Sequence, residues 1–145
     1  MPNDPIRSSL RLVPHIHRAT HRIGLYLAAL RDDDLSQGES HILAYLATAG
    51  PSTIADLHRC LAHKRSTLTS ILDRLTARGL ITREVGVEDR RTFLICPTAQ
   101  GRVAARKVYR HLTNLERSVL NNVSAEDVRA FTRVLAAVED EAKRA

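Results

Sequence analysis

Residues 53–96 read TIADLHRCLAHKRSTLTSILDRLTARGLITREVGVEDRRTFLIC, and this stretch decides the fold. Thr53 precedes Asp56 by three residues, the spacing of a capping box at which two side chains satisfy backbone N–H groups of a helix start. The pattern predicts a short helix over residues 54–61, a tight turn at residues 62–64, and a second helix over residues 67–78 that Gly79 ends. Two such helices joined by a tight turn make a helix-turn-helix.

The pattern changes period after Gly79. Residues 81–85 alternate, residues 86–90 are polar turn material, and residues 91–96 read as a strand with Phe93 and Ile95 on one face. A β-hairpin that directly follows a helix-turn-helix is a wing. Residues 35–97 are therefore predicted to form a winged helix-turn-helix lobe.

Helices are predicted on both sides of this lobe. Apolar side chains recur at helical steps over residues 12–31, and capping boxes at Ser36–Glu39 and Ser124–Asp127 open two further helices. The aspartates at residues 32–34 should end the first helix as a solvated loop, and not as a cation site. A long helix should run from about residue 99 to residue 121. We expect a mainly α fold (α+β), one domain over residues 1–145 with about six helices and one hairpin.

The terminal helices should hold two chains together. Val108, Leu112, Leu115 and Val119 step by four, three and four, which is a heptad-like seam. A small monomer offers little surface on which to bury such a seam. Residues 10–31 and 99–143 are therefore predicted to form the interface of a homodimer.

The composition favours a polyanionic partner. The net charge is +6, which points first to nucleic acid and second to an anionic membrane surface. No apolar run approaches the roughly 20 residues of a membrane span, and the first nine residues lack a secretory signal. We expect a cytoplasmic protein without a membrane partner, in which Cys60 and Cys96 are reduced thiols that act as small apolar fillers.

The outward face of the helix over residues 67–78 suits DNA. Small hydroxyls at Thr67, Thr69 and Ser70 let the helix approach base edges, and Arg74 can fork onto guanine O6 and N7. At the helix start, orphan N–H groups favour a phosphate. An ordinary surface helix would also carry hydroxyls and an arginine. The residues expected at the helix start are Lys64, Arg65 and Ser66.

The hairpin strengthens this interpretation. An arginine at a hairpin tip can enter a narrow minor groove, where the negative potential is deepest. Asp89 is close enough in sequence to orient the guanidinium of Arg91. An ordinary charged turn is the alternative. The DNA-binding side chains expected from the hairpin are Arg83, Asp89, Arg90 and Arg91.

Residues 35–102 resemble the multiple-antibiotic-resistance regulator (MarR) family of bacterial winged-helix repressors. The motifs recur in order and at the family's spacing over about half of the chain, and the flanking helices fit by pattern. One departure is Pro97, where the family usually has leucine. The matching motifs are LS at residues 35–36, TIADL at 53–57, STLT at 66–69, LDRL at 72–75, RGLI at 78–81, DRR at 89–91 and TAQG at 98–101.

The resemblance implies an obligate homodimer with interleaved terminal helices. It implies a helix over residues 66–78 that enters the major groove of a pseudo-palindromic operator, and a wing tip at which Asp89 holds Arg91. Family members take small aromatic acids in a cleft between the dimer helices and the DNA-binding lobe. Side chains that could supply polar handles for such an effector are Tyr26, His41, Tyr45 and His111.

Three other kinds of function have weaker signals in the sequence. His17 and His21 are four residues apart, a spacing that suits two metal ligands, but Ser40 stands where zinc-sensing relatives lead us to expect a carboxylate. We therefore expect no metal and no cofactor, with a metal- or redox-responsive regulator as one alternative and a protein-interaction module as another. The chain lacks a Gly-rich phosphate loop, a nucleophile elbow and a CxxC pair, so we expect no enzyme.

Overall fold

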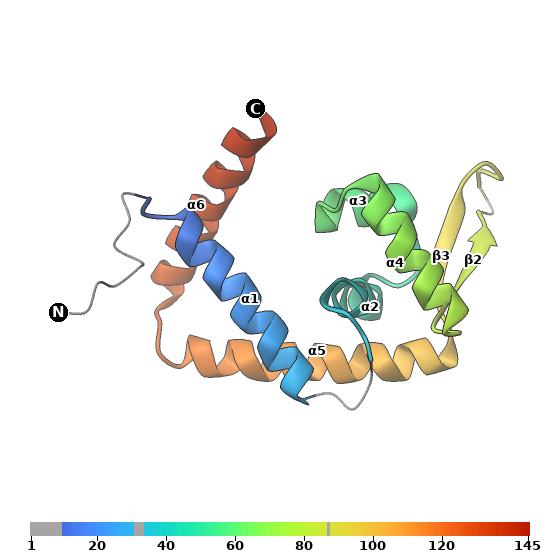
Figure 1. The fold of residues 1–145 in the computed structure, drawn as a ribbon, viewed down its shortest axis with the longest axis horizontal. Helices are drawn as coiled ribbons and strands as arrows, with labels where there is room; N and C mark the ends of the chain where they lie inside the picture. The colour runs from blue at the N-terminus through green and yellow to red at the C-terminus, as the bar shows by residue number, and fades with distance from the viewer. Residues whose placement is uncertain (1–9, 31–33, 87) are drawn as a thin grey trace. The chain divides into compact units, whose positions relative to one another are not determined.

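The computed structural model describes residues 10–30, 34–86 and 88–145 (Figure 1). The prediction that residues 32–34 end the first helix falls largely on Asp32 and Asp33, which lie outside the described residues, as do residues 1–9. The mainly α class with a hairpin wing is confirmed. In chain order the elements are α1 (Val13–Leu30), α2 (Gln37–Ala49), β1 (Ser52–Thr53), α3 (Ile54–Leu61), α4 (Arg65–Ala77), β2 (Ile81–Val85), β3 (Phe93–Pro97), α5 (Ala99–Leu120) and α6 (Ala125–Lys143).

The chain divides into two compact units, Met1–His111 and Leu112–Ala145, and the division falls inside α5. The first unit holds α1 to α4, the sheet and the start of α5. The second unit holds the end of α5 and the whole of α6.

The helix starts follow the predicted local signals. All three capping boxes are formed, each with a hydroxyl that accepts from the N3 backbone N–H and a carboxylate that accepts from the N-cap N–H. Two glycines with a φ of 71° follow helices, Gly50 after α2 and Gly79 after α4, and a positive φ is one that glycine adopts without a steric cost. The capping pairs are Ser36–Glu39, Thr53–Asp56 and Ser124–Asp127.

The core of the first unit lies under α4. Four inward side chains of this helix are each no more than 3% exposed, and they pack in one cluster with α2, α3 and β3. α2 approaches closely, since a Cβ atom added to Gly38 would lie 2.7 Å from Cδ1 of Ile71. This packing fixes which face of α4 points outward. The four side chains are Leu68, Ile71, Leu72 and Leu75.

The sheet has one strand more than predicted. β2 and β3 form the expected antiparallel hairpin, with Ile81 opposite Pro97 and Val85 opposite Phe93. β1, which sequence analysis missed, pairs with the other edge of β3, so the strand order is β1-β3-β2. β3 begins at Phe93 and not at residue 91, because Thr92 still donates its backbone N–H to the Asp89 carbonyl in the turn.

The apolar faces of the terminal helices differ from the prediction in one respect. Val108 is fully buried within the single chain, so it is not available to pack against a second chain as the predicted seam requires. Several apolar side chains of α1 and α6 stay exposed instead, among them Leu25 at 63% and Phe131 at 60%. Among the helices in the described ranges, none is both long enough and apolar enough to cross a membrane.

Candidate nucleic-acid interface

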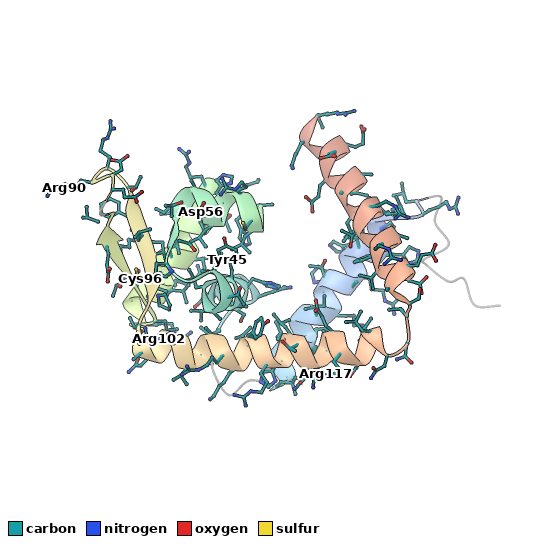
Figure 2. The ribbon with its side chains drawn as sticks, turned by 180° about the vertical axis from the view of Figure 1, so that it is seen from behind. Tyr45, Asp56, Arg90, Cys96, Arg102 and Arg117 are labelled. Atoms are coloured by element: carbon teal, nitrogen blue, oxygen red, sulfur yellow. The ribbon has the colours of Figure 1, made fainter. Side chains whose placement is uncertain are left out.

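The eleven predicted DNA-binding side chains all lie at the surface of the first unit. Every one of them is exposed, whereas the inward face of α4 is buried. They come from two segments: the start and outer face of α4, and the β2–β3 hairpin. Arg90 lies at the hairpin tip (Figure 2). The structure thus places the two segments on neighbouring projections, since α4 and β2 are in contact.

The start of α4 is open. Its N-cap residue Lys64 makes no side-chain capping hydrogen bond, unlike the N-caps of α2, α3 and α6. Ala62, in the turn before it, takes a left-handed conformation with a φ of 53° and ends α3. The first N–H groups of α4 therefore lack the side-chain cap that the starts of α2, α3 and α6 have, and uncapped N–H groups at a helix start favour a phosphate.

Arg74 is held by groups that sequence analysis did not link to it. Its Nε lies 3.4 Å from Oε1 of Glu39 in α2, and its Nη1 donates to Oγ of Ser70 over 3.0 Å. Glu39 is only 3% exposed, and its other oxygen, Oε2, lies 3.7 Å from Nη1 of Arg78. A buried carboxylate of α2 thus faces two arginines at the end of α4. The sequence marked Glu39 only as the last member of a capping box.

The predicted orienting contact at the wing tip is confirmed. Oδ1 of Asp89 accepts from the backbone N–H of Arg91 over 3.0 Å, and the Nε of Arg91 lies 3.4 Å from the same oxygen. The Arg91 side chain remains 93% exposed. It is therefore directed by its neighbour while its guanidinium stays accessible.

Another ion pair, unlike that of Asp89 and Arg91, joins the hairpin to α4. Nη2 of Arg83 donates to Oδ1 of Asp73 over 2.7 Å. Arg83 was predicted as a DNA contact, and Asp73 is an exposed residue of α4. Their pairing gives each of them a structural partner within the interface.

The four predicted effector-binding side chains do not line one pocket. The hydroxyl of Tyr26 donates to the His111 carbonyl over 3.1 Å, so this group is already used within the fold. Tyr45 lies beside Cys60, whose Sγ is 3.5 Å from the tyrosine Oη, and this contact raises the pKa of Tyr45. His41 lines a pocket of about 400 Å³ together with Gln37, Cys60, His63 and Thr20, among others. Apart from His41, sequence analysis missed the lining of this pocket, which comes from three different helices and from the turn after α3.

The cysteines differ from each other. Cys60 is exposed, so its interpretation as an apolar filler is wrong. Cys96 is partly buried, and burial, with a smaller effect of Glu84, raises the pKa of its thiol, which disfavours the reactive thiolate. The Nε2 atoms of His17 and His21 lie 3.3 Å apart on the exposed face of α1. No cluster of three metal-ligating side chains occurs within residues 10–30, 34–86 and 88–145.

The chain is similar in sequence to known transcriptional regulators. Residues 33–92 match the model of the MarR family. The HTH-type transcriptional regulator YdgJ of Bacillus subtilis (strain 168) is 29% identical over 102 residues, which span 70% of this chain but only 62% of that protein. YwhA, another HTH-type transcriptional regulator of the same organism, is 26% identical over 80% of this chain and 88% of its own length.

Solved structures share the fold at lower identity. The MepR–DNA complex of S. aureus superimposes with a TM-score of 0.75 at 20% identity and covers 91% of this chain and 98% of that one. A mutant MarR of E. coli complexed with operator DNA gives a TM-score of 0.69 at 24% identity, with coverages of 88% and 91%.

Proposed function

We propose that this chain is a winged helix-turn-helix transcriptional regulator of the MarR family, a homodimeric repressor that binds a pseudo-palindromic operator; the support is the match of residues 33–92 to the family's model and the fold it shares with MarR-family structures. The observation that carries this proposal is the joint exposure of the outer face of α4 and the arginines of the hairpin tip on one unit. Such a protein acts by occupying DNA in the cytoplasm, and the proposal includes no enzymatic step.

In the proposed complex α4 lies in the major groove. The open helix start binds a phosphate through Lys64, Arg65 and Ser66, which positions the helix on the duplex. Thr67, Thr69, Ser70 and Arg74 then face the base edges. The small hydroxyls permit close approach, and Arg74 is the long donor that can discriminate guanine.

The hairpin binds beside it. Arg91, oriented by Asp89, enters the minor groove, while Arg90 and Arg83 contact the backbone. Backbone and minor-groove contacts of this kind add affinity that depends on salt more than on sequence.

The dimer is supported by apolar surface that a lone chain leaves in water. Val13 and Leu25 on α1 are exposed, as is Leu12 just before this helix, and on α6 Phe131 and Val134 are exposed. Burying a large apolar side chain contributes on the order of 1.5–3 kcal/mol. A second copy that covers these faces would place two reading helices at a fixed separation, as a two-fold operator requires.

Control by a small aromatic acid is the finer part of the proposal. The pocket that His41 lines is the proposed site, because it combines a histidine with apolar walls within reach of α3, the helix before the reading helix. A ligand there releases DNA only if it binds better to a form of the dimer whose reading helices no longer fit the operator. Tyr26, Tyr45 and His111 lie outside this pocket and would act, if at all, through neighbouring residues.

The test is selection of DNA from a random duplex library by the full chain, followed by sequencing. The proposal predicts enrichment of one pseudo-palindrome whose half-sites lie about one helical turn apart. A protein-interaction module would enrich nothing, and a monomeric DNA binder would enrich a single half-site. Either result would exclude the proposed function.

A further inference from the structure

Glu39 stands out because a buried carboxylate is costly unless it is paired. It is 3% exposed in a helix start that its capping box already stabilises through Oε1. A capping box needs no burial, since the equivalent Asp127 of α6 is exposed. The burial of Glu39 therefore needs a further reason, and the arginines of α4 supply the compensating charge.

The contact reaches across two helices that pack side by side. α2 and α4 lie next to each other in the first unit (Figure 1). Oε1 of Glu39 lies 3.4 Å from Nε of Arg74, and Ser70 accepts from Nη1 of the same guanidinium. The Nε atom of Arg74 is thus held on the α2 side, while about half of the side chain remains exposed to solvent.

We propose that Glu39 is a positioning residue that sets base specificity by holding Arg74 in an end-on orientation. A guanidinium has five N–H donors in a rigid fork. With Nε directed to Glu39 and one Nη1 hydrogen to Ser70, the remaining hydrogens of Nη1 and Nη2 form the fork that can meet guanine O6 and N7. The inference rests on the proposed DNA-binding function.

Arg78 provides an internal comparison. It approaches the other oxygen of Glu39, at 3.7 Å, but it stands at the end of α4, beyond the predicted contact face. Its loss should leave the Arg74 contact with Oε1 in place. Arg78→Ala therefore tests whether any loss of charge beside Glu39 has the same effect as losing the carboxylate.

The experiment measures dissociation constants of the full chain for its selected operator and for every single base-pair substitution, at one salt concentration. Arg74→Ala should lower discrimination at one base pair per half-site by roughly 5- to 140-fold. Glu39→Gln should lower discrimination at that same base pair and at no other. The double variant should match Arg74→Ala, because the two residues act through one contact.

Further variants separate a loss of the Arg74 contact from a loss of folding. Glu39→Asp keeps the charge and an acceptable cap, since aspartate fills this position in the capping boxes of α3 and α6, but it withdraws the carboxylate from Arg74. It should lose the same discrimination. Arg78→Ala and the capping-box control Asp127→Asn should keep it.

Three results would count against the inference or its basis. Retained discrimination in a folded Glu39→Gln or Glu39→Asp variant would overturn it. An equal loss of affinity for all sequences would assign Glu39 a merely structural role and would overturn it as well. A parent chain that prefers no sequence would overturn the proposed function itself, which is a separate outcome.

Discussion

Arg83 of β2 and Asp73 of α4 form an ion pair, with Nη2 2.7 Å from Oδ1. The pair joins the hairpin to the helix that we propose as the reading element. Because both side chains are partly exposed, the pair contributes little to stability, on the order of 0–1 kcal/mol. We expect its effect to lie in the relative placement of the two projections that we propose to bind DNA, and in the neutralisation of one arginine there by an acid.

Asp73→Ala should therefore change specificity more than stability. Loss of the carboxylate removes a negative charge beside Arg83 and leaves its guanidinium unpaired for the proposed backbone contact, so affinity for random DNA should rise. The ratio of operator to random affinity should fall, because the hairpin loses its tie to α4. Both constants are measurable by fluorescence anisotropy. Asp140→Ala on α6, with the same charge change, is the control and should preserve the ratio.

Arg91→Ala should weaken DNA binding almost uniformly across sequences. Each cationic contact that is lost flattens the salt slope by about 0.9, so a dimer that loses both of its Arg91 contacts should show a slope smaller by about 1.8. Asp89→Ala should cause a smaller loss, since it removes the orienting contact and leaves the charge. Arg144→Ala removes an equal charge at the end of α6. An Arg91→Ala slope equal to that of the parent or of Arg144→Ala would contradict a role at the wing tip.

Phe131→Asp should shift the chain toward monomer. Phe131 is 60% exposed in the single chain, so the monomer should tolerate the change, while a dimer interface would acquire an unpaired charge. Sedimentation velocity over a micromolar concentration series should detect the shift. Thr132→Asp at the adjacent, exposed position is the matched control. Identical behaviour of the two variants would place the interface elsewhere.

The helix caps should make stability fall at acid pH. The Thr53 hydroxyl lowers the pKa of Asp56, and the Ser124 backbone lowers the pKa of Asp127. A folded-state pKa below the unfolded value of about 3.9 gives stability that is present above that value and is lost as pH falls through the folded pKa. Asp127→Asn should flatten the dependence of the melting temperature on pH below about pH 4. An unchanged pH profile would show that this cap contributes no proton-linked stability.

Sequence analysis succeeded where a structural signal lies within a few residues. The capping boxes, the end of α4 at Gly79 and the Asp89–Arg91 contact all depend on neighbours in the chain, and each was predicted. The outward face of α4 was predicted for the same reason, because the apolar period that sets the opposite, buried face follows from local spacing.

The parts that were missed depend on distant residues. β1 is two residues long and forms only by pairing with β3, which gives it no periodic pattern of its own. Glu39 and Arg74 are 35 positions apart, and a capping glutamate carries no sign of burial. The Tyr26 hydroxyl donates to the His111 carbonyl, 85 positions away, and such a contact has no local signature. The sequence alone therefore predicts Tyr26 as a ligand contact.

The ratio of operator affinity to random-DNA affinity tests the central claim most directly. The parent chain is titrated at one physiological salt concentration onto its selected operator and onto a duplex of the same composition in scrambled order. Sequence-specific regulators bind their sites about 10³- to 10⁷-fold tighter than other DNA. We predict a ratio within this range, reduced by Arg74→Ala and retained by Arg91→Ala as both affinities fall together. Equal affinity for the two duplexes would contradict sequence-specific binding through α4.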